Sequence, residues 1–244
     1  MKTTQLIFLI LSTFFVPVTF GNTDSVQCIE ERSIQFDLIK KPANRLYNGH
    51  EEVIETLPKL VYWCDGQYVQ KNLDKISYFL RDRTSSGGVH AINPKLLDVV
   101  YEIFNELSYT GSIRVVSGYR SAKSQKKLRK SGNYTAARNS THTSGGALDF
   151  YVPGYTNLGK NKDCTNCRQQ FYKAALRVLE RHQIGGLGAY CGPSLHVDVR
   201  AGNARSKGDN RSIVRRWGAS MSILDGTRKP SNKERDIGMP KSCL

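Results

Sequence analysis

Hydrophobic residues recur at helical spacing in two separate segments of the chain. The first segment predicts an amphipathic helix that begins with Asn93 as its N-cap and has Pro94 in its first turn. Its apolar positions are Leu96, Leu97, Val100, Phe104 and Leu107. The second segment predicts a helix that ends near His182, where the charge of that side chain suits the helix dipole. Its apolar positions are Phe171, Ala174, Ala175, Val178 and Leu179.

Strict alternation of apolar and polar residues marks two other segments, 146–152 and 194–199, as strands. The residues that alternation assigns to the core side are Leu148, Phe150 and Val152 in the first, and Leu195, Val197 and Val199 in the second. Asp149 then lies on the opposite face of its strand, as do His196 and Asp198 on theirs. A short strand at 113–117, followed by a helix that begins near Ser121, completes a small, mainly antiparallel sheet with helices packed to one side, an α+β fold.

Polar residues on these strands form a candidate metal site. His142, Asp149 and His196 supply two imidazoles and one carboxylate, which is the open ligand set of a catalytic zinc ion rather than the closed set of a structural one. Gly145 and Gly146 allow a tight turn that brings His142 over Asp149. The alternative is that each histidine is a satisfied structural residue, which is also our interpretation of His90 in its loop.

The spacing of these residues resembles a known family of zinc peptidases. The pattern S-x-H-x-x-G-x-A-x-D from Ser140 to Asp149, with H-V-D from His196, resembles the D-Ala-D-Ala peptidases, lysostaphin-type enzymes and hedgehog. The match is closer to the murein endopeptidase branch that ends in H-x-D. Its further motifs are L-R-D at 80–82, V-H at 89–90, N-P-K-L-L-D at 93–98, V-S-G-Y-R-S at 116–121 and G-G-L-G at 185–188. The resemblance implies the fold of hedgehog and the D-Ala-D-Ala peptidases.

This resemblance also implies an activity and a set of roles. The activity is hydrolysis of peptide bonds in peptidoglycan stem peptides or their cross-links by a zinc-activated water, with endopeptidase favoured over D,D-carboxypeptidase. One Zn²⁺ ion per chain is implied, and its ligands are His142, Asp149 and His196. Arg120 takes the role of clamp on the substrate or transition state, and Tyr119 and Ser140 are further candidates for substrate binding.

One departure from the family pattern concerns the catalytic base. Many relatives carry a carboxylate three residues before the final histidine, where this chain has Pro193. Asp198 shares a strand face with His196 and is the remaining candidate for general base. The other interpretation of Asp198 is that it orients a metal ligand. The departure also leaves a second functional class open, a non-catalytic zinc-dependent module that binds cell wall or polyanions.

The two ends of the chain differ in composition from the middle. Lys2 precedes an apolar run from Leu6 to Phe20, with small residues before Asn22, which predicts a signal peptide over 1–21. No second run approaches the roughly twenty residues of a spanning helix, so we expect no transmembrane segment after signal removal and export to the periplasm or extracellular space. An N-terminal extension at 22–70, a zinc peptidase domain at 71–201 and a basic C-terminal tail at 202–244 follow.

Cysteine and charge composition add two expectations. The six cysteines are Cys28, Cys64, Cys164, Cys167, Cys191 and Cys243. An even number in an exported chain favours disulfides, with the pairing left open; Cys164 and Cys167 are alternatively half of a structural zinc site or a redox pair. The net charge is +15, and eight basic residues but no acidic ones lie between Glu106 and Asp149. Anionic cell-envelope polymers are candidate partners, a merely solvated basic surface is the alternative, and no nucleic acid is expected because no binding motif accompanies the charge.

Overall fold

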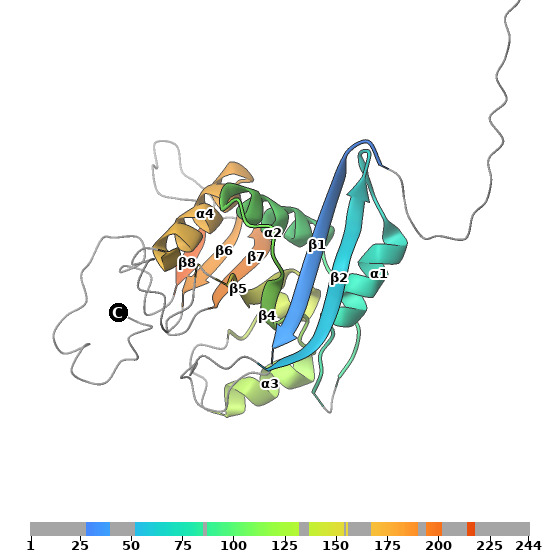
Figure 1. The fold of residues 1–244 in the computed structure, drawn as a ribbon. Coiled ribbons are helices and arrows are strands. Elements are labelled where there is room, and N and C mark those ends of the chain that lie inside the picture. Colours follow the sequence, from blue (N-terminus) through green and yellow to red (C-terminus); the bar gives the residue numbers. More distant parts are fainter. Residues whose placement is uncertain are drawn as a thin grey trace, which may run out of the picture.

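A single mixed sheet runs through the part of the chain that the computed structural model describes, which is residues 28–39, 52–84, 87–131, 137–153, 155, 167–189, 194–201 and 214–217. The strands are β1 Glu31–Ile39, β2 Val53–Cys64, β3 Gln67–Tyr68, β4 Ile113–Ser117, β5 Ala147–Tyr151, β6 Ile184–Ala189, β7 Leu195–Ala201 and β8 Arg215–Trp217. The helices are α1 Gln70–Phe79, α2 Pro94–Glu106, α3 Ala122–Lys130 and α4 Cys167–Arg181, with a 3-10 turn, η1, at Thr141–Ser144. Figure 1 shows their arrangement.

The eight described strands lie in the order β3-β2-β1-β4-β5-β7-β6-β8. Only the β1–β4 and β6–β8 pairs are parallel, and all the others are antiparallel. The α+β class and the mainly antiparallel pairing are therefore confirmed. Strands β1 to β3 come from before residue 71, so the segment expected as an extension supplies three strands of the same sheet.

The core lies on one side of the central strands, where α2 and α4 pack together (Figure 1). Phe150 on β5 contacts the rings of Phe104 on α2 and Phe171 on α4, at centroid distances of 6.1 and 5.5 Å. Leu148 and Val197 are fully buried in the same cluster. The alternation predicted for β5 and β7 is thus confirmed, and it leaves Asp149, His196 and Asp198 on the opposite face.

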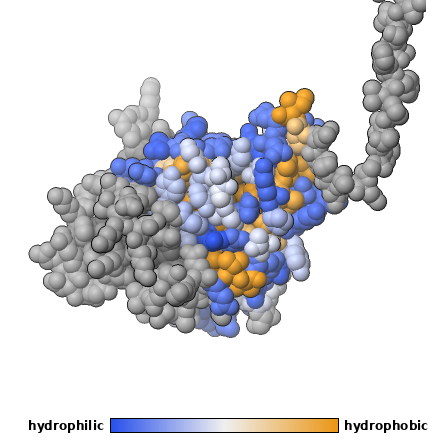
Figure 2. Space-filling view, viewed as in Figure 1, coloured by the Kyte–Doolittle hydropathy of each residue, from blue (hydrophilic) through white to orange (hydrophobic). Residues whose placement is uncertain are grey.

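A second part of the core lies under the β1–β2 hairpin. Phe36 on β1 stacks against Phe79 on α1 at 5.9 Å, and both side chains are buried. The surface in this view is mainly hydrophilic, with hydrophobic residues gathered near the two ends of the hairpin (Figure 2). Parallel pairing of β1 with β4 joins the hairpin to the rest of the sheet, and the apolar burial beneath it stabilises that arrangement.

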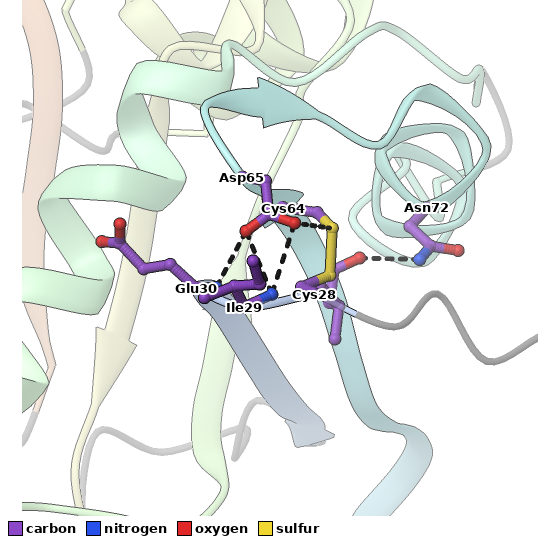
Figure 3. The surroundings of a disulfide bond; sticks show 7 residues. Cys28, Ile29, Glu30, Cys64, Asp65 and Asn72 are labelled. Atoms are coloured by element: carbon purple, nitrogen blue, oxygen red, sulfur yellow. Dashed lines mark hydrogen bonds between the residues drawn. A yellow bond between two sulfur atoms is a disulfide. The ribbon is translucent and has the colours of Figure 1, made fainter. Parts of the chain in front are cut away.

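A disulfide and a set of hydrogen bonds hold together the end of the hairpin where β1 begins and β2 ends. A disulfide joins Cys28 to Cys64, across 36 residues of sequence (Figure 3). Beside it, the Asp65 carboxylate accepts hydrogen bonds from the backbone N–H groups of Ile29 and Glu30. This pair confirms the expected disulfide chemistry for two of the cysteines. Cys164, Cys191 and Cys243 lie outside the described residues.

Predicted helix and strand boundaries agree with the structure where the local signals were strong. Asn93 caps α2 by accepting from the Lys95 N–H at 3.0 Å, and Ser121 caps α3 by accepting from the Ser124 N–H at 3.2 Å. Strand β4 spans the predicted residues. Within the described residues no helix is both long and apolar enough to cross a bilayer. The predicted signal peptide at 1–21, Pro193, and the tail from 202 onward, apart from 214–217, lie outside the described residues.

Candidate metal centre

The turn η1 places the first candidate ligand, His142. It begins after Ser140 and ends at Gly145, which has the left-handed backbone angle φ 68°. A side chain at Gly145 would put its Cβ 2.3 Å from the Ala91 carbonyl oxygen. Both observations require glycine, which confirms the tight turn expected at this position. The turn buries the His142 side chain almost completely.

Strands β5 and β7 place the other two ligands. They pair antiparallel, with Asp149 directly opposite His196. Directly opposed residues on one sheet face have Cβ atoms about 5 Å apart, so their side chains meet above the sheet. Cross-strand register, together with the alternation of each strand, therefore brings a carboxylate and an imidazole together at one point.

The polar atoms of the three side chains converge closely. His196 Nδ1 lies 2.8 Å from Asp149 Oδ1, and His142 Nε2 lies 3.2 Å from His196 Nδ1 and 3.3 Å from Asp149 Oδ2. Each residue offers one ligand atom within 4.8 Å of the others. The structure thus brings together the three residues that the sequence nominated.

Each imidazole is held by its other nitrogen. His142 Nδ1 donates to the Gly118 carbonyl oxygen at 2.6 Å, which leaves Nε2 facing the cluster. His196 Nε2 contacts Asp198 Oδ2 at 3.0 Å, which leaves Nδ1 facing the cluster. Histidines that bind metals almost always have the second ring nitrogen bonded to a carbonyl or carboxylate in this way, since that contact fixes the tautomer and the ring orientation.

Burial and neighbouring charges set the protonation of the cluster. Burial lowers the pKa of His142, so that its imidazole is neutral at neutral pH. Burial alone would raise the pKa of Asp149, but the two adjacent imidazoles hold it well below its ordinary value. Burial also opposes the charge on His196, yet hydrogen bonds to Asp149 and Asp198 raise its pKa to about 8. The cluster is rich in lone pairs and attracts a proton or another cation.

The donor set fits a zinc ion. Ligands about 2.0–2.1 Å from a tetrahedral ion lie about 3.3 Å from one another, by geometry. The separations of 2.8, 3.2 and 3.3 Å between the facing atoms are close to this value. Two imidazole nitrogens and a carboxylate oxygen are also the ligand types that zinc favours in open sites. The residues that would hold the ion are therefore in place.

Arg120 lies beside the cluster. Its guanidinium donates to Gln125 Oε1 at 2.8 Å and to Ser117 Oγ at 2.9 Å, and one terminal nitrogen is 3.7 Å from Asp149 Oδ2. Its backbone N–H donates to the His142 carbonyl oxygen at 3.1 Å. Side-chain and backbone contacts therefore fix a positive charge next to the three candidate ligands.

Tyr119 and Ser140, the other two candidates for substrate binding, lie near the turn η1. The Tyr119 ring stacks on His90 at 5.0 Å, and a Cβ added at Gly145 would lie 3.2 Å from His90. Ser140 precedes η1, and its carbonyl oxygen accepts from the Thr143 hydroxyl at 2.7 Å. Both residues therefore adjoin the turn that holds His142.

Comparison with known proteins gives a consistent assignment. The sequence profile described as peptidoglycan L,D-endopeptidase MepK matches residues 45–206. The chain belongs to this family. It is 32% identical over 137 residues to the peptidoglycan L,D-endopeptidase MepK of Escherichia coli strain K12, a match that covers 55% of this chain and 66% of that protein. It is 36% identical over 83 residues to the probable MepK of Haemophilus influenzae, which covers 34% of this chain and 44% of that protein. No solved structure matches the chain significantly.

Asp198 differs from the ligands in its surroundings. Its side chain is fully buried, and its carboxylate accepts from Arg200 Nε at 2.8 Å and from the Thr141 hydroxyl at 3.1 Å, besides contacting His196 Nε2. Burial would raise the pKa of Asp198, but His196 and Arg200 outweigh it and lower the pKa below its ordinary value. Of the two ring nitrogens of His196, Asp198 contacts Nε2, which faces away from the cluster.

Sequence reasoning did not identify the residues that support the centre. Arg200 is two positions after Asp198 on the same strand face, so the alternation that found His196 contained this signal. Thr141 is adjacent to His142, but nothing in the sequence relates it to Asp198. Gln125 and the Gly118 carbonyl give no signal, because a helix side chain and a backbone oxygen acquire these roles only through tertiary contacts.

His182 and His90 take no part in the cluster. His182 Nε2 lies 2.8 Å from Glu102 Oε1 on α2, where it joins the end of α4 to that helix. His90 is exposed and stacks on Tyr119. Of the described histidines, only His142 and His196 converge with a carboxylate in a metal-binding arrangement.

Proposed function

We propose that this chain is an exported zinc-dependent peptidase that hydrolyses peptide bonds in peptidoglycan stem peptides or their cross-links, as an endopeptidase. One observation carries the proposal: two imidazoles, each fixed through one nitrogen, direct the other nitrogen at a point shared with the Asp149 carboxylate. Membership of the MepK family and the names of its relatives support the choice of substrate. Export rests on the sequence pattern of residues 1–21 alone.

His142, Asp149 and His196 are the proposed ligands of one zinc ion. When bound, such an ion supplies Lewis-acid polarisation of a carbonyl and lowers the pKa of a coordinated water. The chain contributes the fixed orientation of both rings. It also contributes a carboxylate that is ionised at neutral pH, because the neighbouring imidazoles hold the pKa of Asp149 low.

Arg120 is proposed to hold a substrate carboxylate or the oxyanion that develops during peptide hydrolysis. Its guanidinium uses hydrogen bonds to Gln125 and Ser117 to stay in place, and a guanidinium has five N–H donors in all. A positive charge that is already oriented stabilises developing negative charge without reorganisation. Tyr119 and Ser140, which adjoin η1, are proposed to contact the substrate on either side.

Asp198 is proposed to orient His196 rather than to act as general base. A base must lie within hydrogen-bonding reach of the proton that it takes. The carboxylate of Asp198 is fully buried and is surrounded by Arg200, Thr141 and the far nitrogen of His196. Of the two roles left open by the sequence, the orienting one fits these contacts.

A non-catalytic zinc-dependent module that binds cell wall or polyanions is the second candidate. The observation in its favour is Pro193, which stands where many relatives carry a carboxylate. A metal site of this composition also serves binding in proteins that do not catalyse hydrolysis. The two candidates share the zinc site and differ in turnover.

Digestion of purified peptidoglycan by the zinc-loaded protein, followed by mass analysis of the products, separates these candidates. We expect new peptide termini that vanish with a chelator and return with added zinc, and no products from His142→Ala. The mass of the products identifies the bond that is cut. Intact peptidoglycan in the presence of fully bound zinc would instead favour the binding module.

A further inference from the structure

A pocket of about 580 Å³ lies beside the metal centre, between helix α3 and the segment that leads into η1. Ala122, Gln125, Lys126 and Arg129 line it from α3. These four positions have the spacing i, i+3, i+4 and i+7, so they form one face of the helix. Arg138 and Thr141 line the facing wall. The pocket is thus formed by two segments that also contribute to the centre.

Two side chains, Gln125 and Thr141, connect this pocket to Arg120 and to the residues around the candidate metal centre. Gln125 donates to the Ala137 carbonyl oxygen at 2.7 Å and accepts from Arg120 at 2.8 Å, so a single buried side chain joins both walls to Arg120. On the other wall, Thr141 is adjacent in sequence to His142 and donates to Asp198. A molecule in this pocket would therefore contact Thr141, which precedes the proposed ligand His142. It would also contact Gln125, which is hydrogen-bonded to Arg120.

The pocket is positively charged. Lys126, Arg129 and Arg138 line it, and among the described residues none of the three forms a salt bridge. No acidic residue occurs in the sequence between Glu106 and Asp149. All three residues are exposed, and cations clustered on one part of a surface attract anions to that part.

We propose that this pocket is the subsite for a carboxylate of the peptide substrate, and that Lys126, Arg129 and Arg138 select substrates with a free carboxylate near the bond that is cut. This inference rests on the proposed function for the identity of the substrate. The arginines supply planar pairs of N–H donors that match a carboxylate. The location of the pocket, next to the proposed ligands and Arg120, favours a carboxylate of the peptide substrate over an anionic wall polymer as its occupant.

Helix α3 offers an internal control. Lys123, Lys127 and Lys130 lie on a neighbouring face of the same helix and do not line the pocket. The triple variant K126Q/R129Q/R138Q therefore removes three charges from the pocket, whereas K123Q/K127Q/K130Q removes three charges from the same region outside it. If general electrostatic attraction held the substrate, both triple variants would bind it equally weakly. If the pocket is a subsite, only K126Q/R129Q/R138Q weakens binding.

The experiment compares two synthetic cross-linked stem peptides that are identical except that the free carboxylates of one are converted to amides. Binding to the zinc-loaded protein is measured by calorimetry, cleavage by mass analysis, and zinc content is checked for each variant. We expect the wild type to bind the acidic peptide at least about tenfold more tightly, the effect of about one charge-assisted hydrogen bond. The pocket variant loses this preference, and the outer-face variant keeps it.

Equal binding of the two peptides by the wild type would overturn the subsite, whether or not the peptides are cleaved. So would an equal loss of preference in the two triple variants. Competition by inorganic phosphate without any preference for the carboxylate would assign the pocket to phosphate-containing polymers, and would also overturn the proposal. Preference for the acidic peptide without cleavage would leave the subsite standing and count against the proposed peptidase activity alone.

Discussion

Two aspartates, the buried Asp98 and the half-buried Asp149, have neighbours of opposite kinds. Asp98 on α2 accepts from Arg32 at 3.0 Å, from the Tyr68 hydroxyl at 2.6 Å and from the Tyr62 hydroxyl at 3.3 Å. Each of these neighbours brings its own proton. Asp149 instead faces two imidazole nitrogens, each on a ring whose other nitrogen is already bonded.

The difference distinguishes a carboxylate with a structural role from one that is a candidate metal ligand. Around Asp98 the donors match the acceptors, so the network is complete and joins the β1–β2–β3 segment to α2. Burial, with Asp98 nearby, raises the pKa of Tyr68 to about 12, which keeps its hydroxyl a donor. Around Asp149 the lone pairs outnumber the protons, an arrangement that a bound cation would complete. Asp98 is the more buried of the two carboxylates, so burial does not mark the candidate ligand, whereas counting protons does.

The largest expected effect comes from removal of a metal ligand. His142→Ala, Asp149→Ala and His196→Ala should each lower activity by about 10⁴-fold or more, because the site loses the ion that activates the nucleophile. Zinc content should fall together with activity, while the folded content, measured by circular dichroism, should be that of chelated wild type. Retained activity without zinc in any of these variants would refute the assignment of that ligand.

Asp98→Ala should have the opposite profile. It leaves the partly buried Arg32 without its partner, and we expect the free energy of unfolding to fall by about 3 kcal/mol. Zinc bound per folded molecule should not change. Chemical denaturation and zinc analysis measure the two quantities. Glu31→Ala is the control, because its exposed pair with Lys59 should contribute less than about 1 kcal/mol.

Asp198→Asn tests a carboxylate of intermediate kind, because Asp198 contacts the proposed ligand His196 but does not itself face the cluster. We expect about 10–100-fold weaker zinc affinity, because the ring of His196 is held less firmly. Turnover at saturating zinc should remain of the same order. Titration against a competing chelator measures the affinity. Unchanged affinity with lost turnover would favour the general-base role instead.

Asp82 is another carboxylate whose described neighbours are hydrogen-bond donors. Its replacement should have the smallest effect of the substitutions considered. It accepts from the backbone N–H groups of Thr84 and Ser121 at 3.0 and 2.9 Å. Burial would raise the pKa of Asp82, but these and the serine hydrogen bonds hold it below its ordinary value. Asp82→Asn should lower the free energy of unfolding by about 1 kcal/mol at neutral pH.

The pH dependence of that loss has a definite sign. A depressed folded-state pKa stabilises the protein above the unfolded value of about 3.9, and the contribution is lost as the pH falls towards the folded-state pKa. The gap between wild type and Asp82→Asn should therefore narrow in acid. Denaturation curves at neutral and acidic pH measure it, and an equal gap at both would show that the charge of Asp82 contributes nothing.

Local sequence signals predicted the centre of the fold better than its edge. Helix α2 follows from the Asn93 cap and its apolar spacing, and both confirmed strands follow from alternation. The hairpin was not predicted because Tyr62 alone is buried in β2, so this strand lacks the alternating pattern of a half-buried strand. Pairing of Cys28 with Cys64 joins residues 36 positions apart, and sequence gives no rule for such a choice.

Sequence alone determined which side chains face away from the core. Alternation along a strand follows from local backbone geometry, so the sequence places Asp149, His196 and Asp198 on the polar faces of their strands without any tertiary contact. Only the tertiary structure decided which nitrogen of each imidazole faces the cluster and which neighbour Asp198 contacts. Those choices depend on the Gly118 carbonyl oxygen, on η1 and on the pairing of β5 with β7, which bring together atoms that the sequence separates by tens of residues.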